Sequence, residues 1–152
     1  MGSPLHKISV HKSALVPYPA PAMYALVADV DSYPSFLPWC RGASVRARSD
    51  GIVEASLEVA RGPIRQRFST RNTMHPHEAI ELRLLDGPFR RLEGHWHFVA
   101  LGENGCRVSL DLEFEFSSAV LRHLLGPVFR EMANSLLSAF CRRARDLYDG
   151  AD

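Results

Sequence analysis

The sequence predicts an α+β fold in which a curved antiparallel sheet of about six to seven strands wraps around one long C-terminal helix. Apolar and polar residues alternate with a period of two from about residue 39 to 116, which is typical of strands with one dry face and one wet face. From about residue 119 to 148 the apolar spacing changes to that of a helix. A helix with a single apolar stripe needs a large dry surface, and the inner face of the sheet supplies it.

The elements before the sheet are a first strand, from about Ile8, and two short helices. A corner at residues 17–21 leads into a helix over residues 21–30. Asp31 and Ser32 then cap a second helical turn that ends at Leu37 and Pro38.

The strands follow one another as antiparallel neighbours, because short segments rich in Gly, Pro, Asp and Asn separate them. These turns fall at residues 49–51, 61–63, 75–77, 86–88 and 102–105. The clearest alternation runs from Cys106 to Phe116, with charged residues between the apolar ones. In the last helix, Gly126 and Pro127 predict a kink or a break near the first turns.

Size and composition limit the classes of protein. A chain of 152 residues predicts a single domain over residues 1–152. A hydrophobic share of 46% and a charged share of 23% are those of a globular protein. Eighteen Lys and Arg against seventeen Asp and Glu give a net charge of +1, which offers no support for DNA binding. Three scattered cysteines without a CxxC pair indicate reduced thiols and a cytoplasmic location.

Several strings of the sequence resemble one known family. YPSFLPWC at residues 33–40, TRN at 70–72, DGPFRRLEGHW at 86–96 and FEF at 114–116 are similar to the coenzyme Q-binding START-like family, and within it to the bacterial ribosome association toxins. The match covers nearly the whole chain. Trp39 departs from the toxin pattern, which has a small residue there, and could narrow the mouth of a pocket.

The resemblance implies a helix-grip START-like fold with an internal apolar cavity. In the respiratory members it implies a polyprenyl quinone such as ubiquinone as bound ligand, in support of respiration, and no required cofactor. In the toxin members it implies binding to the large ribosomal subunit, which blocks subunit joining. Fold alone does not choose between these two roles.

The residues themselves allow a plain packed core or a ligand cavity under the last helix. Apolar residues in predicted loops, namely Phe36, Leu37, Trp39 and Phe89, favour a cavity with an aromatic gate. The predicted wall comprises Phe36, Leu37, Trp39, Phe68, Phe89, Trp96, Leu110, Phe114, Val128, Phe129, Met132 and Leu136.

A polar ligand head needs hydrogen-bond donors. Gln66, Thr70 and Asn72 share the parity of Phe68 and so point inward. They form either a polar handle for the ligand or a water-bonded end of the sheet. Arg71 has the opposite parity, which predicts a surface ladder.

Metal binding and catalysis find little support. His95 and His97 lie on the wet face with no third ligand placed by spacing, so we expect no metal site. Asp111, Glu113 and Glu115 are on the wet face too, and no nucleophile motif occurs. We therefore expect a binding protein and not an enzyme, with a polyketide cyclase-like enzyme as the alternative.

Arginines gather near the end of the last helix: Arg142, Arg143 and Arg145. They complement the helix dipole on a solvated face, or they contact phosphates of anionic lipid or of ribosomal RNA. The expected partners are therefore a hydrophobic small molecule such as a quinone or lipid, and as alternatives the large ribosomal subunit or, by peripheral contact, the inner membrane.

Overall fold

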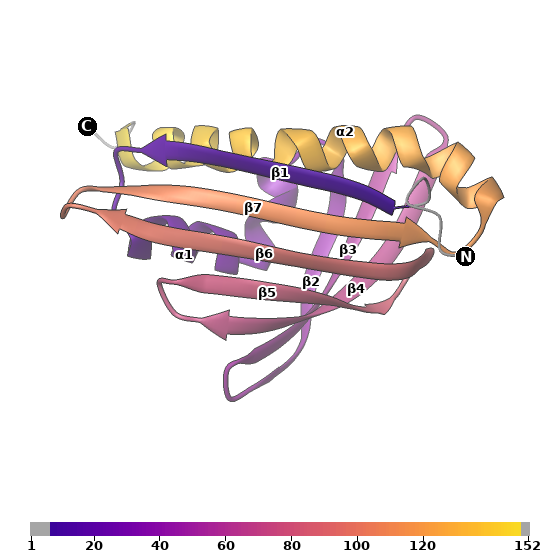
Figure 1. Cartoon of the computed structure of the whole chain (residues 1–152), viewed down its shortest axis with the longest axis horizontal. Helices are drawn as coiled ribbons and strands as arrows, with labels where there is room; N and C mark the ends of the chain where they lie inside the picture. Colours follow the sequence, from indigo (N-terminus) through magenta and orange to yellow (C-terminus); the bar gives the residue numbers. More distant parts are fainter. Residues whose placement is uncertain (1–6, 150–152) are drawn as a thin grey trace.

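The computed structural model describes residues 7–149, in which a seven-stranded antiparallel sheet curves around a long helix (Figure 1). The elements are β1 (Lys7–Val16), α1 (Ala20–Ala28), the 3-10 helix η2 (Val30–Ser35), β2 (Cys40–Ser49), β3 (Ile52–Arg61), β4 (Ile64–His75), β5 (Ala79–Asp86), β6 (Phe89–Leu101), β7 (Gly105–Phe116), α2 (Ala119–Ala144) and the π-helical turn η3 (Arg145–Asp149). The predicted helix-grip arrangement is confirmed.

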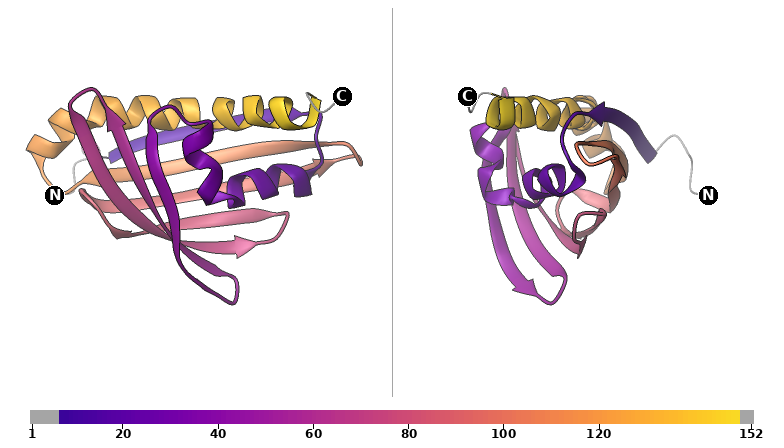
Figure 2. Two further views of the ribbon diagram at one scale, coloured as in Figure 1. Left: turned by 180° about the vertical axis from the view of Figure 1, so that it is seen from behind. Right: turned by 90° about the vertical axis from the view of Figure 1, so that its left-hand side faces the viewer.

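The strand order in the sheet is β1-β7-β6-β5-β4-β3-β2, so β1 and β2 are the edges. β6 and β7 pair along almost their full length, from Phe89↔Phe116 to Leu101↔Gly105. β5 pairs with β6 only from Ala79↔His97 to Arg83↔Glu93. β2, β3 and β4 therefore diverge from the long strands and cross them at a steep angle (Figure 2), which gives the sheet a deep concave face.

The concave face is apolar because of the predicted alternation. On β7, Val108, Leu110 and Phe114 are buried while Arg107 is exposed. α2 lies over this face with its buried side, which includes Leu125, Phe129, Met132, Leu137 and Phe140. The apolar stripe of the helix therefore meets the dry face of the sheet, as expected.

Two expectations about helices need correction. The second helical turn begins at Val30, which is buried, and not at Asp31, and it ends at Ser35. α2 does not break at Gly126 and Pro127 but continues through them. Pro127 removes the bond to the carbonyl of His123, and both residues are exposed, so water can satisfy that carbonyl.

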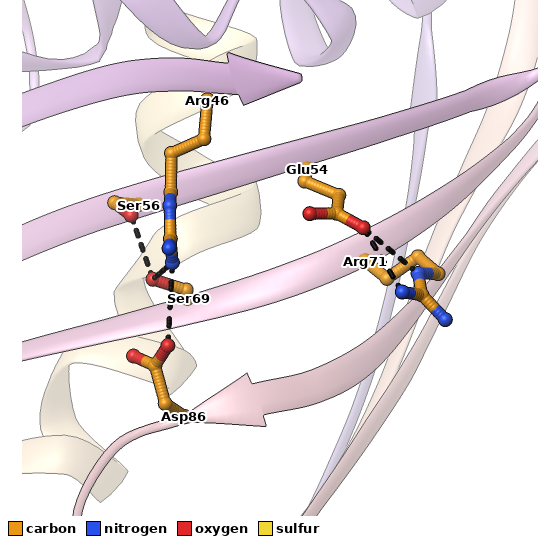
Figure 3. A network of polar contacts seen from close by, with 6 residues as sticks. All are labelled: Arg46, Glu54, Ser56, Ser69, Arg71 and Asp86. Carbon is orange, nitrogen blue, oxygen red and sulfur yellow. Dashed lines mark hydrogen bonds and ion pairs between the residues drawn. The ribbon is translucent and has the colours of Figure 1, made fainter. Parts of the chain in front are cut away.

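A polar network that runs from the exposed Arg46 and Asp86 to the buried Ser56 and Ser69 ties the edge strand β2 to β5 across the convex face (Figure 3). Arg46 donates to Ser69 Oγ at 3.0 Å and to Asp86 at 3.2 Å, and Ser56 and Ser69 share a bond of 2.6 Å. Ser69 is only 1% exposed although it lies on the outer face. Arg71, further along β4, donates twice to the exposed carboxylate of Glu54, so it is part of a surface ladder.

Candidate functional site

An apolar cavity of about 130 Å³ lies between α2 and the concave face. Strands β3 to β7 form its floor, and α2 forms one side. Its roof consists of α1, η2 and the segment after η2 that contains Leu37 and Trp39. The described lining is Val27, Ala28, Val30, Tyr33, Leu37, Trp39, Val53, Ala55, Leu57, Val59, Phe68, Thr70, Asn72, Met74, Ile80, Leu82, Leu92, Trp96, Leu112, Phe129, Met132, Leu136 and Phe140.

The cavity exists because the floor carries short side chains. Val53, Ala55 and Val59 of β3 face the interior with short side chains. Phe140, by contrast, is almost completely buried and closes one boundary with its ring against Trp96, at a centroid distance of 5.3 Å. The short side chains of β3 leave room that the larger side chains of the other walls do not fill.

Two polar side chains interrupt the apolar wall. Thr70 and Asn72 of β4 are buried, and Thr70 Oγ1 donates to Asn72 Oδ1 at 2.7 Å. Asn72 makes no other side-chain hydrogen bond with a residue of the described range 7–149, so the N–H groups of its amide remain for the cavity that it lines. The site therefore offers one oriented amide in a largely apolar surrounding.

The roof contains one titratable group, Tyr33. Its hydroxyl donates to the carbonyl of Val27, and burial raises the pKa of Tyr33 well above its ordinary value. The ring packs against Phe36 and Phe140 at 6.1 and 5.4 Å. Tyr33 thus joins η2 to α1 and α2 as a neutral phenol.

Nine of the predicted site residues come together around the cavity. They are Leu37, Trp39, Phe68, Trp96, Phe129, Met132 and Leu136 of the predicted wall, and Thr70 and Asn72 of the predicted polar handle.

The other predicted site residues lie outside the cavity lining. They are Phe36, Phe89, Leu110, Phe114, Val128 and Gln66. Phe89 is the first residue of β6, not a loop residue, and is 5% exposed. Leu37 is completely buried. The expectation that these two form an exposed gate is wrong, because both pack into the core.

Several lining residues escaped the sequence analysis. Val53, Ala55 and Val59 of β3 and Ile80 and Leu82 of β5 all have inward parity. The alternation that predicted the strands was the signal that could have found them. The predicted wall instead consisted mainly of large and aromatic residues, whereas short side chains create the space.

The three arginines after Leu136 take different places. Arg143 lies over the ring of Phe36, 5.1 Å from its centroid, in a cation–π contact. Arg142 and Arg145 are exposed. The candidates for phosphate contact are thus two solvated arginines beside one that covers an aromatic ring.

The described residues show neither a metal site nor a membrane-spanning helix. His95 and His97 are exposed with stacked rings 5.9 Å apart, and within residues 7–149 no group of three or more His, Cys, Asp or Glu could hold a metal ion. No helix in that range is long and apolar enough to cross a membrane.

A curved antiparallel sheet that holds a long C-terminal helix over an apolar cavity defines a helix-grip, START-like domain. The chain belongs to the polyketide cyclase / dehydrase and lipid transport family, whose model matches residues 16–141.

Relatives with curated names fall into two groups. The chain is 47% identical to the ribosome association toxin RatA of Pseudomonas aeruginosa, over 91% of this chain and 96% of that one. It is 40% identical to the toxin of the same name from Escherichia coli, over 91% and 88%. It is also 30% identical to the mitochondrial coenzyme Q-binding protein COQ10 homolog B of Xenopus laevis, over 93% of this chain and 60% of that protein.

Solved structures support the fold. An 18 kDa protein of Caulobacter crescentus is 35% identical, covers 95% of this chain and 99% of its own, and superposes with a TM-score of 0.71. A START superfamily protein of Mycobacterium smegmatis is 26% identical, with coverage of 91% and 98% and a TM-score of 0.77. The Zhui aromatase/cyclase of Streptomyces is 20% identical, with coverage of 96% and 99% and a TM-score of 0.83, which shows a shared fold alone.

Proposed function

We propose that this protein is a non-catalytic binding domain that holds a polyprenyl quinone such as ubiquinone, with the head ring inside the cavity. The observation that carries the proposal is an apolar cavity with one oriented amide in its wall. Sites for small ligands have this character, with few polar groups in an apolar surface.

The size of the cavity fits a ring and not a whole polyprenyl chain. An engineered apolar cavity of about 150 Å³ binds benzene, so the volume of about 130 Å³ suits one six-membered ring. The tail would leave past lining residues that are only half-buried, such as Trp39, Met74 and Leu136. Each CH₂ group buried there contributes about 0.8 kcal/mol, so a few isoprene units can offset the cost of association.

The polar groups fit a quinone because its carbonyl oxygens only accept hydrogen bonds. Thr70 donates a hydrogen bond to Asn72 Oδ1, so the oxygen of the amide already has a partner and its orientation is fixed. The N–H groups of Asn72 are then the donors that face a ligand carbonyl. A ligand head that only donates would leave both partners unpaired, at a cost of about 1–3 kcal/mol.

The lining also argues for binding without catalysis. Among the described lining residues Tyr33 is the only side chain that titrates, and its hydroxyl is bonded to Val27 with a raised pKa. General acid–base or nucleophilic catalysis needs a group that changes protonation near neutral pH. The aromatase/cyclase neighbour shares the fold, which supports no reaction here.

The test is the lipid content of protein purified from a quinone-producing host. Extraction with organic solvent and mass spectrometry should recover a quinone close to one per protein. Ala55→Phe places a ring in the cavity and should abolish the recovery, while Ala47→Phe, on the exposed part of β2, should not. Asn72→Leu should lower it by about tenfold, the effect of one lost hydrogen bond. Protein that is folded and carries no lipid in any preparation would contradict the proposal.

A second candidate function is association with the large ribosomal subunit, which would block subunit joining. The names of relatives that are 40 to 47% identical over nearly their whole length favour it. The exposed Arg142 and Arg145 are candidates for phosphate contacts.

Sedimentation in sucrose gradients tests the second candidate. The protein should sediment with free large subunits. The double variant Arg142→Glu, Arg145→Glu should bind them more weakly, and its remaining affinity should depend less on salt concentration. Arg48→Glu on β2 is the matched control. Ribosome profiles that stay unchanged when the protein is in excess would remove this candidate.

A further inference from the structure

A groove separate from the cavity runs along the edge of the sheet, between β1 and α2. We call it the β1–α2 groove. Figure 1 shows α2 running alongside β1. It consists of two adjoining hollows of about 510 and 590 Å³ that share Asn134 of α2. One is bordered by residues 12–18, the other by Ile8 and the first half of α2.

The groove exposes the edge of a strand. β1 is an edge strand of the sheet and pairs only with β7 among the described strands. Residues 12–16 all border the groove. Because successive side chains of a strand point to opposite faces, a surface shared by five consecutive residues is the strand edge itself. About half of these residues direct their N–H and C=O groups away from β7 and toward the groove.

The charge of the groove is positive. Lys12, Arg130 and Arg145 border it and form no ion pair with a residue of the described part of the chain. Two carboxylates border it as well: Glu131, which pairs with Arg61, and Asp149, which accepts from the hydroxyl of Tyr18. The cations outnumber these carboxylates, which favours an acidic occupant.

We propose that the β1–α2 groove binds an extended, acidic segment of a partner protein, which adds to the sheet as a further strand on β1. A strand satisfies both the donors and the acceptors of the exposed edge. A nucleic acid or an anionic lipid surface offers phosphate acceptors but no row of donors at the spacing of the outward carbonyls. A second copy of this chain would bring Lys12 and Arg145 against their own like charges.

The first experiment measures binding of a labelled nine-residue peptide in which glutamate alternates with valine. Fluorescence anisotropy should show binding that weakens as salt is raised. A peptide with lysine in place of glutamate should bind at least about tenfold more weakly. Polyadenylate of the same charge should not compete. If the lysine peptide binds equally well, or if polyadenylate displaces the acidic one, the proposal is overturned.

The second experiment asks whether the bound peptide is a strand. Hydrogen exchange of the amides in residues 12–16 should slow when the peptide binds, and alkylation of Cys141, which borders the groove and is half-buried, should slow with it. Binding that protects neither would be electrostatic adhesion and would refute strand addition. Dimers of the protein without peptide would show that a second copy is the occupant.

Variants separate this groove from the ligand cavity. Lys12→Glu and Arg130→Glu together should weaken peptide binding about tenfold or more, while Arg48→Glu should leave it unchanged. If the double variant fails to fold, Lys12→Met alone should still weaken binding about threefold. The lipid content of all these variants should equal that of the parent, because neither Lys12 nor Arg130 lines the cavity. If the variants bind the peptide as tightly as the parent protein does, the proposal is contradicted.

Discussion

The space between α2 and the sheet has a solid end and a hollow end. At the solid end Phe89 is surrounded by four other rings, with centroid distances of 5.7 Å to Phe68, 5.9 Å to Phe114, 5.1 Å to Phe116 and 5.3 Å to Phe129. At the hollow end β3 presents short side chains and a cavity of about 130 Å³ remains. The same two layers are thus either core or binding site, and side-chain volume at facing positions decides which.

The polar groups follow this division. Thr70 and Asn72 lie at the hollow end, whereas the cluster of Phe89 and its four neighbouring rings contains no polar side-chain atom. A buried amide costs free energy unless it is paired, so a free N–H group is tolerable only where a ligand or water can reach it. The amide of Asn72 can therefore be buried here because the cavity lies beside it.

The largest effect is expected from Phe89→Ala. Removing the central ring of the solid end leaves a void that four neighbouring rings cannot close, so the free energy of unfolding should fall by about 3–5 kcal/mol. Urea denaturation followed by tryptophan fluorescence measures it. Phe36→Ala serves for comparison, because that ring is only half-buried, and should cost less. A loss below about 1 kcal/mol for Phe89→Ala would show that this end is not rigidly packed.

A smaller effect is expected from Thr70→Val. The change keeps the shape of the side chain but removes the donor to Asn72 Oδ1, so the free energy of unfolding should fall by about 1 kcal/mol. Thr73→Val, at a half-buried position of the same strand, is the control and should change less. An equal loss for both variants would mean that the bond to Asn72 contributes nothing specific.

Ala55→Leu should have little effect on stability, or a favourable one. The added carbons enter existing space, so the free energy of unfolding should stay within about 1 kcal/mol of the parent or rise. Val108→Leu places one extra carbon at a completely buried position outside the cavity and should cost about 1–3 kcal/mol. Thermal melts of both variants measure the difference. The reverse order would mean that the hollow end is already filled when the protein is in solution.

The sequence predicted the layers better than the cavity, for a physical reason. Period-two alternation determines which side of a strand is dry, so it predicted the inward faces of the strands but not which inward residues border a cavity. Whether a dry space is full depends on which side chains face each other across it. That pairing requires the register, such as Ala55↔Thr70 between β3 and β4, and the position of α2. The sequence therefore placed Phe89 and Leu37 at a gate, whereas packing buries both.

The alkylation rates of the three cysteines compare how easily the hollow end and other buried parts of the structure open, without a change in stability. Burial raises the pKa of Cys40, Cys106 and Cys141, and for Cys141 the charge of Arg145 partly opposes the rise. Alkylation needs the thiolate, so every rate should be low at pH 7 and rise about tenfold per pH unit up to the pKa.

The order of reaction should follow the burial of the three thiols. Cys141, which is half-buried, should react first. Cys40 follows Trp39 at the cavity wall, so local opening of the hollow end should expose it before Cys106, which is completely buried where β7 begins, opposite Val16 of β1. Mass spectrometry of timed N-ethylmaleimide reactions gives the order, and Cys106 reacting as fast as Cys40 would mean that the cavity wall and the start of β7 open together.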